Sequence, residues 1–266
     1  MRTHIAATPA DLLVESQGEI ACLWEVCSRK PGNVHPRAEF RDVGLIDFVL
    51  SASAVRTVLQ RTHQGSVGWT IRRAVEETRR STGSNTNLGI ILLLFPLAHA
   101  CRQRRPLRET LADVLAALSV SDAAEVFAAI RLATPGGLGD APEQDVRDEP
   151  TVTLLEAMRL AADRDMVARQ YANGFADVFD FGVPAFLAAF EKCGCVEAAI
   201  IDSQLRWLAE YPDSLIARKN GPVAAADVQA RAREVLRRGG LDTPDGRRAG
   251  VGLDRHLRSD GNRLNP

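Results

Sequence analysis

The chain has 266 residues, of which 45% are hydrophobic and 25% are charged, and this composition is typical of a globular protein with a large core. Its 33 basic and 34 acidic residues give a net charge of −1 at pH 7. Because such a chain has no overall field that attracts nucleic acid or an anionic membrane, we expect neither as a partner, and any phosphate binding must be local.

Helical periodicity recurs along most of the chain, whereas alternating β patterns and hairpin dipeptides are nearly absent. Thr8-Pro9 is typical of a helix N-cap followed by proline, and apolar residues then return on one face. We therefore expect an all-α fold, built as a compact single-domain bundle over residues 1–240. The expected helices are at about 9–28, 44–62, 67–81, 85–103, 107–117, 121–132, 150–173, 183–193, 195–210 and 224–238.

The first break in this pattern is the loop Arg29-Lys30-Pro31-Gly32-Asn33, at the end of the first predicted helix. Pro31 removes a backbone donor and Gly32 permits a positive φ, which leaves Lys30 and Asn33 at a helix end. A point charge and an amide placed there can contact phosphate oxygens. The alternative is an ordinary helix-terminating turn with a solvated lysine.

The second motif is the polar segment of residues 81–89, which directly precedes the very apolar run of residues 90–95. A helix this apolar must be buried on nearly all sides, so its N-terminus would point unpaired N–H groups into the interior. Asn85, Thr86 and Asn87 at that end predict a cradle for an anion such as a triphosphate. Alternatively, these side chains only cap the helix, although capping needs a single such residue.

The third motif is a row of acids, Glu149, Glu156 and Asp163, which are spaced by seven residues. Wherever the segment is helical, this spacing places the three carboxylates on one face. Carboxylates that face inward could hold Mg²⁺ between the phosphates of a substrate. The alternative is a surface ladder of ion pairs, because Glu156 and Arg159 have helical i,i+3 spacing.

The fourth motif, residues 211–221, contains Asp213, Arg218 and Lys219 in a short helical turn. The two basic residues can reach phosphate, and Asp213 can accept a hydroxyl proton. The alternative is an aspartate N-cap with two solvated bases. In contrast, Gly136-Gly137 follows no predicted strand and is not a dinucleotide fingerprint.

Beyond the last predicted helix, residues 241–266 contain five Arg, four Gly and two Pro with scattered apolar positions. We expect this segment to be a loosely packed C-terminal tail and not a helix. The five cysteines lack the spacing of a disulfide framework, and the longest apolar run, residues 90–98, is far shorter than the ~20 residues that span a bilayer. These features predict a cytoplasmic protein.

Taken together, the motifs resemble those of the triphosphoribosyl-dephospho-CoA synthase family, over about residues 15–240. The resemblance is carried by Lys30-Pro31-Gly32, Asp47-Phe48 with Ser51-Ala52, Thr82-Gly83 with Asn85-Thr86 and Gly89, and Asp213 with Arg218. It implies an all-α enzyme that takes ATP, displaces adenine from C1 of its ribose and joins the triphosphoribosyl group to the ribose 2′-hydroxyl of 3′-dephospho-CoA.

Such a glycosyl transfer builds positive charge on the sugar, so it requires a carboxylate beside the ribose and a base for the incoming hydroxyl. Under this resemblance, Asp47 and Asp213 are candidates for the base. Glu149, Glu156 and Asp163 are candidates for binding Mg²⁺ or for stabilising the oxocarbenium ion. The expected phosphate contacts are Lys30, Asn33, Asn85, Thr86, Asn87, Arg218 and Lys219.

The sequence also differs from the family at two places. The family motif usually continues Asn-Thr-His-Lys-Gly, whereas this chain has Asn87-Leu88 in place of His-Lys, and the family commonly has an acid where His35 stands. Two alternatives therefore stay open. One is a divergent paralogue that transfers a phosphoribosyl-type unit to another small alcohol, for example in pterin cofactor biosynthesis, and the other is a non-catalytic nucleotide-binding protein. A homodimer is likewise left open.

Overall fold

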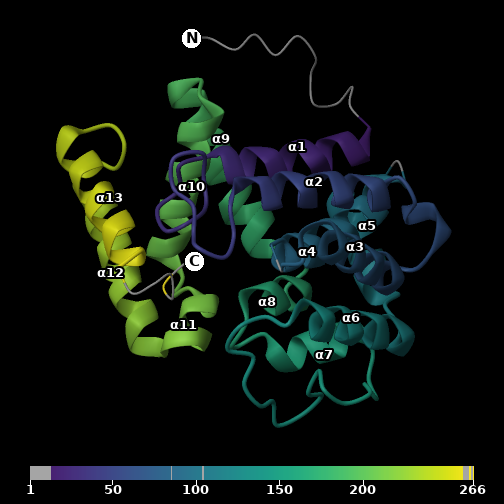
Figure 1. The fold of residues 1–266 in the computed structure, drawn as a ribbon. Helices are drawn as coiled ribbons and strands as arrows, with labels where there is room; N and C mark the ends of the chain where they lie inside the picture. Colours follow the sequence, from purple (N-terminus) through teal and green to yellow (C-terminus); the bar gives the residue numbers. More distant parts are fainter. Residues whose placement is uncertain (1–12, 85, 104, 260–263, 265) are drawn as a thin grey trace. The chain divides into compact units, whose positions relative to one another are not determined.

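The computed structural model describes residues 13–84, 86–103, 105–259, 264 and 266. These residues form helices and no β-strand, apart from one isolated bridge between His35 and Ala38 (Figure 1). The predicted all-α fold is confirmed. In the part of the chain that the structure describes, no helix combines the length and the apolar character needed to cross a bilayer.

The helices follow the predicted order. Their bounds are α1 (Val14–Cys27), α2 (Leu45–Leu59), the 3-10 helix η2 (Thr62–Gln64), α3 (Val67–Thr82), α4 (Leu88–Cys101), α5 (Leu107–Ala116), α6 (Val120–Ala133), α7 (Leu154–Ala161), α8 (Met166–Ala172), the π-helix η3 (Val178–Gly182), α9 (Val183–Cys193), α10 (Val196–Glu210), α11 (Ser214–Asn220), α12 (Pro222–Arg237) and α13 (Pro244–Leu257).

The chain divides into two compact units, which we describe separately. Unit 1 consists of Met1–Leu23, Ile46–Pro135 and Asp140–Phe175, and unit 2 consists of Trp24–Leu45, Gly136–Gly139 and Ala176–Pro266. The single domain over residues 1–240 stays a prediction.

In unit 1, helices α3 and α6 pack closely because a glycine lies where they meet. A Cβ atom at Gly68 would lie 2.5 Å from the Cα atom of Asp122, so a larger residue would push the helices apart. The Gly68 N–H donates to the Asp122 carboxylate at 2.8 Å, and the same carboxylate forms a capping box with Ser119 at the start of α6. One buried acid thus joins the beginnings of both helices.

The very apolar helix α4 is buried, as predicted: none of residues 91–100 is exposed. Pro96 lies inside this helix and lacks the N–H that would pair with the Leu92 carbonyl one turn earlier. The hydroxyl of the fully buried Tyr171, on α8, donates to that carbonyl at 2.5 Å. Tyr171 therefore satisfies a backbone acceptor that the proline leaves open.

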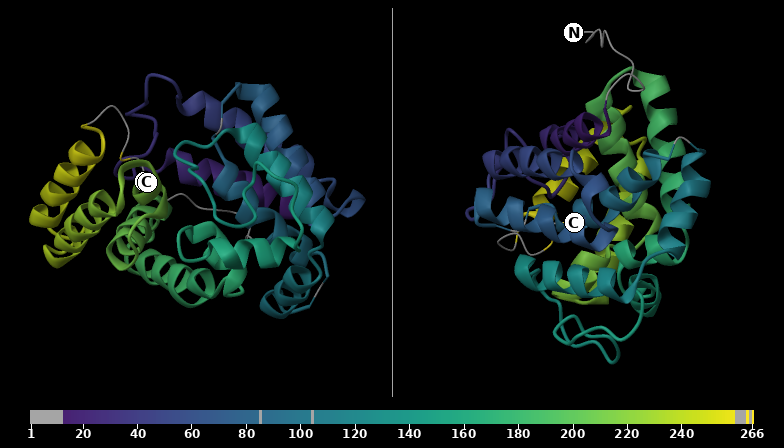
Figure 2. Two further views of the ribbon diagram at one scale, coloured as in Figure 1. Left: turned by 90° about the horizontal axis from the view of Figure 1, so that it is seen from below. Right: turned by 90° about the vertical axis from the view of Figure 1, so that its right-hand side faces the viewer.

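In unit 2, helices α10, α12 and α13 enclose a separate core, and α12 and α13 lie side by side (Figure 2). The core is built from buried aliphatic side chains of these helices, of α11 and of residue 264. They include Leu205, Leu208, Ile216, Val228, Val235, Leu253, Leu257 and Leu264.

The expectation of a loosely packed tail is wrong for residues 244–257, which form α13. Thr243 caps this helix, and Leu253 and Leu257 are buried one turn apart. One glycine of this segment is required by packing, because a Cβ atom at Gly246 would lie 2.1 Å from the carbonyl oxygen of Gly240. The low apolar content of the segment therefore concealed a helix that buries only a few side chains.

Candidate active site

Lys30 lies in the loop of unit 2 that follows α1, and it is only 6% exposed. Its Nζ donates to the Glu25 carboxylate, one turn back on α1. Burial lowers the pKa of the Lys30 ammonium, to about 7, while the adjacent carboxylate favours the charged form. The solvated lysine of the alternative interpretation is therefore wrong, and the residue is a buried, ion-paired cation.

Asn33, in the same loop, is held by structural hydrogen bonds on both sides of its amide. Its Nδ2 donates to the Pro266 carbonyl at 3.2 Å, and its Oδ1 accepts from the Gln204 side chain at 2.7 Å. Arg258, the C-cap residue of α13, donates to its backbone carbonyl. The Asn33 amide thus ties the loop to α10 and to the C-terminal residue, which differs from the phosphate contact expected for it.

Two elements of the resemblance meet in unit 1. Asp47 lies in the first turn of α2, and the buried hydroxyl of Ser51 donates to its backbone carbonyl at 2.7 Å. The Ser51 hydroxyl also contacts the Thr86 hydroxyl, just before α4. Thr86 is therefore placed beside the start of α2, with Asp47 one turn away. Asn85, the first residue of the expected cradle, lies outside the described residues.

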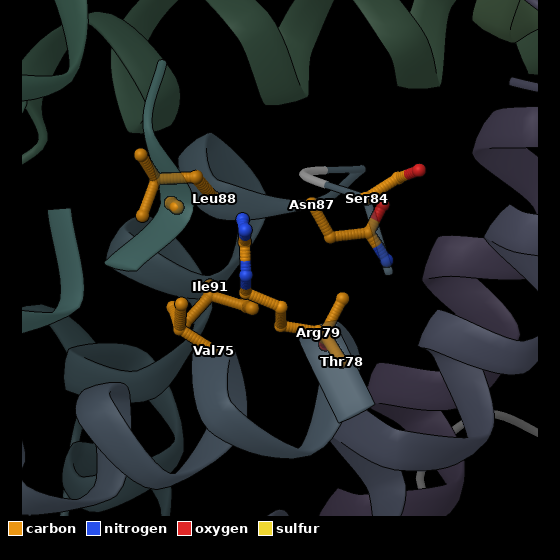
Figure 3. A pocket seen from close by; sticks show the side chains of 8 residues that line it. Val75, Thr78, Arg79, Ser84, Asn87, Leu88 and Ile91 are labelled. Carbon is orange, nitrogen blue, oxygen red and sulfur yellow. The ribbon is translucent and has the colours of Figure 1, made fainter. Parts of the chain in front are cut away.

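Asn87 occupies the N-cap position of α4 but makes no capping hydrogen bond through its side chain. It is 3% exposed, and neither atom of its amide has a hydrogen-bond partner among the described residues. Simple capping is therefore wrong for this residue. Asn87 lines a small pocket together with side chains of α3, α4 and α6 and of the segment between α3 and α4 (Figure 3): Val75, Thr78, Arg79, Ser84, Leu88, Ile91 and Ala133.

Sequence reasoning missed Thr78 and Arg79 as members of this pocket. Both lie in the last turn or so of α3, which ends at a left-handed Gly83 immediately before the polar motif. Their position before Gly83 could have indicated this, because a helix that ends at a glycine brings its last turn close to the residues that follow.

The acidic row does not form the expected metal site. The 150–173 segment is divided into α7 and α8, so Glu149 and Asp163 lie outside helices and the three acids share no helical face. All three are exposed, and Glu156 forms a capping box with Thr153. Within the described ranges, no group of three His, Cys, Asp or Glu side chains is arranged to hold a metal ion. The break arises because Asp165 caps α8.

Asp213 caps α11 in unit 2, accepting a hydrogen bond from the Ile216 N–H at 2.8 Å. Burial raises the pKa of its carboxyl, and the nearby Lys219 and Arg218 partly oppose this. Burial also lowers the pKa of Lys219. The N-cap of the alternative interpretation is present, but its carboxyl is half-buried and stands beside two cations.

The Gly136-Gly137 segment packs against this same short helix. Gly137 has a φ of +70°, and a Cβ atom there would lie 3.0 Å from the Arg218 carbonyl oxygen, while one at Gly136 would lie 3.7 Å from Lys219 Cε. The positive φ and the close approach of this loop to α11 therefore require glycine at position 137, whereas the contact at Gly136 is an ordinary one. No pattern in the sequence indicates this contact, because Gly137 and Arg218 are 81 residues apart.

The protein is thus an all-α protein, and several of the polar and charged side chains described above, among them Lys30, Asn87 and Asp213, lie in loops or at helix ends. The model of the CitG family, described as ATP:dephospho-CoA triphosphoribosyl transferase, matches residues 13–266. The chain belongs to this family.

A solved structure from Archaeoglobus fulgidus, described as that of a proposed triphosphoribosyl-dephospho-CoA synthase, shares the fold. Its TM-score is 0.63 at 23% sequence identity, and the match covers 80% of this chain and 88% of that chain. No curated protein matches the chain. The family makes the chain a transferase, with ATP as the substrate of the family's reaction, and it supports the main interpretation of the sequence over the paralogue and the non-catalytic protein.

Proposed function

We propose that this protein transfers the triphosphoribosyl group of ATP to the ribose 2′-hydroxyl of 3′-dephospho-CoA and releases adenine. The observation that carries the proposal is the family match over residues 13–266. In the reaction, the bond between C1 of the ribose and adenine breaks and a bond from C1 to the acceptor oxygen forms. The acceptor hydroxyl gives its proton to a base, and adenine leaves with a proton.

For the general base we propose Asp213. A general base works best when its pKa lies near the working pH, and burial moves the pKa of Asp213 upward in that direction. Its carboxylate already holds the start of α11, so its position is fixed before substrate binds. Asp47 stays the alternative base, beside Ser51 and Thr86 in unit 1.

As phosphate donors in unit 2 we propose the cations of Lys30, Arg218 and Lys219. Within unit 1 we propose Thr86 and Asn87, just before and at the start of α4, together with Asn85, which lies outside the described residues. Support comes from the burial of Lys30 and Asn87, since desolvated donors bind anions more strongly than solvated ones. Asn33 is not part of this donor set, because its amide is already bonded within unit 2, and we assign it a role in the stability of the Lys30 loop.

Mg²⁺ remains part of the proposal only as a companion of the triphosphate, because it usually keeps several waters and binds through substrate phosphates. Glu149, Glu156 and Asp163 do not fit a site for it, and we assign it no step. A cytoplasmic location is supported by the five cysteines, all of which are free thiols. The homodimer stays a prediction that light scattering would test.

The activity is tested by incubating the protein with ATP and identifying the products by mass spectrometry. We expect release of adenine that depends on 3′-dephospho-CoA, together with an adduct of dephospho-CoA and the triphosphoribosyl group. Adenine release that requires a different alcohol would instead favour the paralogue. No turnover with any acceptor would favour the non-catalytic protein.

The assignment of the base is tested by Asp213→Asn, with Asp245→Asn on α13 as the exposed control. We expect kcat to fall about 10²- to 10⁴-fold in Asp213→Asn and to stay unchanged in the control. In the wild type, kcat/KM should fall as the pH drops through the raised pKa of Asp213, above the range of an ordinary aspartate. It should also fall as the pH rises through the lowered pKa of Lys30, since the cation is then lost.

The acid-side decrease should disappear in Asp213→Asn, and the alkaline decrease should move upward in Lys30→Arg, whose guanidinium stays charged. An unchanged acid limb in Asp213→Asn, together with its loss in Asp47→Asn, would transfer the role of base to Asp47.

A further inference from the structure

The pocket at the start of α4 contains an arginine that the proposed function does not use. Arg79 lies in the last turn of α3, half-buried, with its side chain on the pocket wall (Figure 3). Its guanidinium makes no ion pair or hydrogen bond with any described residue. The other arginines of this helix, Arg72, Arg73 and Arg80, each pair with a glutamate. Arg79 therefore differs from the other arginines of α3, because its half-buried guanidinium has no carboxylate beside it among the described residues.

Two neutral polar groups in the same pocket are also without partners. Asn87 is 3% exposed and Thr78 is 4% exposed. In the described part of the chain, three buried atoms of these two residues have no hydrogen-bond partner: Asn87 Nδ2, Asn87 Oδ1 and the Thr78 hydroxyl oxygen. A buried polar group left without a partner costs about 1–3 kcal/mol, so a protein keeps such groups where a ligand or water supplies the missing bonds.

The N-terminus of α4 adds a further positive contribution to the pocket. This helix has 14 residues, no acidic side chain in its first turn and no side-chain cap from Asn87. Its first N–H groups and the positive end of its dipole are therefore not balanced by the usual carboxylate or hydroxyl. An arginine, an amide and a helix N-terminus together are a combination that favours an anion.

We propose that this pocket binds a single phosphoryl group, with the Arg79 guanidinium as its cation and Asn87 Nδ2 and the Thr78 hydroxyl as neutral donors. The apolar walls, Val75, Leu88, Ile91 and Ala133, restrict the space to a compact anion and strengthen the charge interaction. The inference deepens the proposed function and rests on it for the source of the phosphoryl group, the triphosphate of ATP. The diphosphate of dephospho-CoA has the same chemistry and is the other source.

The proposal is tested by calorimetric titration of the whole protein with inorganic triphosphate, ATP and dephospho-CoA. We expect Arg79→Gln to weaken triphosphate and ATP binding about 10- to 100-fold, the effect of losing one charge-assisted contact. Arg79→Lys should lose less, because it keeps the charge but not the planar fork. Arg80→Gln is the matched control and should stay within about twofold, since exposed Arg80 already pairs with Glu77.

Each outcome decides the proposal. Unchanged triphosphate and dephospho-CoA binding in Arg79→Gln would overturn it, as would the absence of triphosphate and dephospho-CoA binding by the wild type. A loss confined to dephospho-CoA would keep the phosphoryl site and assign it to the diphosphate. Since Arg79 has no ion-pair or hydrogen-bond partner among the described residues, its variants should melt at the wild-type temperature. Binding is read without turnover, so a wild type that binds triphosphate but releases no adenine would sink only the proposed function.

Discussion

The loop after α1 and the start of α4 carry the same residue type, and the sequence assigned the same role to both. Asn33 and Asn87 were each expected to contact phosphate. The structure treats them in opposite ways: the Asn33 amide is bonded on both sides to Pro266 and Gln204, whereas the Asn87 amide is more deeply buried and has no partner in the described residues.

The difference separates two uses of a polar side chain. A buried amide whose bonds are satisfied by the chain stabilises a conformation, and a ligand would have to break those bonds to reach it. A buried amide with no partner lowers the stability of the free protein, and a ligand that forms hydrogen bonds with it offsets this loss. Asn33 therefore belongs to the support of the Lys30 loop, and Asn87 belongs to the binding surface.

The largest effect that this comparison predicts is on stability. Asn33→Ala removes two side-chain hydrogen bonds and leaves Gln204 without one of its acceptors, so we expect the free energy of unfolding to fall by about 2–3 kcal/mol. Chemical denaturation of the variant and the wild type would measure this. Triphosphate affinity, measured in the same preparations, should change by less than about threefold, and a large loss of affinity with unchanged stability would reverse the assignment of the two asparagines.

The next effect concerns Asn87. Asn87→Leu replaces an unpartnered buried amide by an apolar side chain of similar shape, so stability should stay constant or rise by about 1 kcal/mol. Triphosphate affinity should fall about tenfold as the neutral donor is lost. If thermal melting showed the ~1 kcal/mol loss that is typical of removing an N-cap, Asn87 would be a cap in solution and the distinction from Asn33 would fail.

Much of the fold could be predicted from the sequence because periodicity is local. The buried α4 follows from a continuous apolar run. Helices α3 and α9 both end at a glycine, and α3 also begins at a side-chain cap, Ser66. Helix α13 was missed because it buries only a narrow stripe of apolar side chains, with Leu253 and Leu257 one turn apart, among glycines and charged residues that are typical of a loose segment. The division of residues 150–173 was missed because Asp165, which caps α8, reads in sequence as one more charge in a charged row.

The site was harder to predict, because residue type and spacing do not state which bonds are already made. Lys30, Asn87 and Asp213 were found by their motifs, yet their burial, which sets their pKa or their need for a partner, depends on distant elements. The prediction of a metal site at Glu149, Glu156 and Asp163 was wrong because it assumed one continuous helix, whereas the segment is divided into α7 and α8. Arg79 belongs to none of the predicted motifs. It is identified only in the structure, where its guanidinium makes no ion pair or hydrogen bond with a described residue.

A smaller loss of stability than at Asn33 is expected at Tyr171, which is the hydrogen-bonded counterpart of Asn87 within unit 1. Its hydroxyl is fully buried and donates to the Leu92 carbonyl that Pro96 leaves unpaired, so Tyr171→Phe should lower the free energy of unfolding by about 1–2 kcal/mol without changing triphosphate affinity. Denaturant titration beside Asn87→Leu makes the contrast direct. The two substitutions each remove a buried polar group from the same unit, but only Tyr171→Phe removes a bond. Equal stability changes in the two variants would mean that the presence or absence of a hydrogen-bond partner does not distinguish structural side chains from ligand-binding ones. The proposal for Arg79 depends on that distinction and would then lose its physical basis.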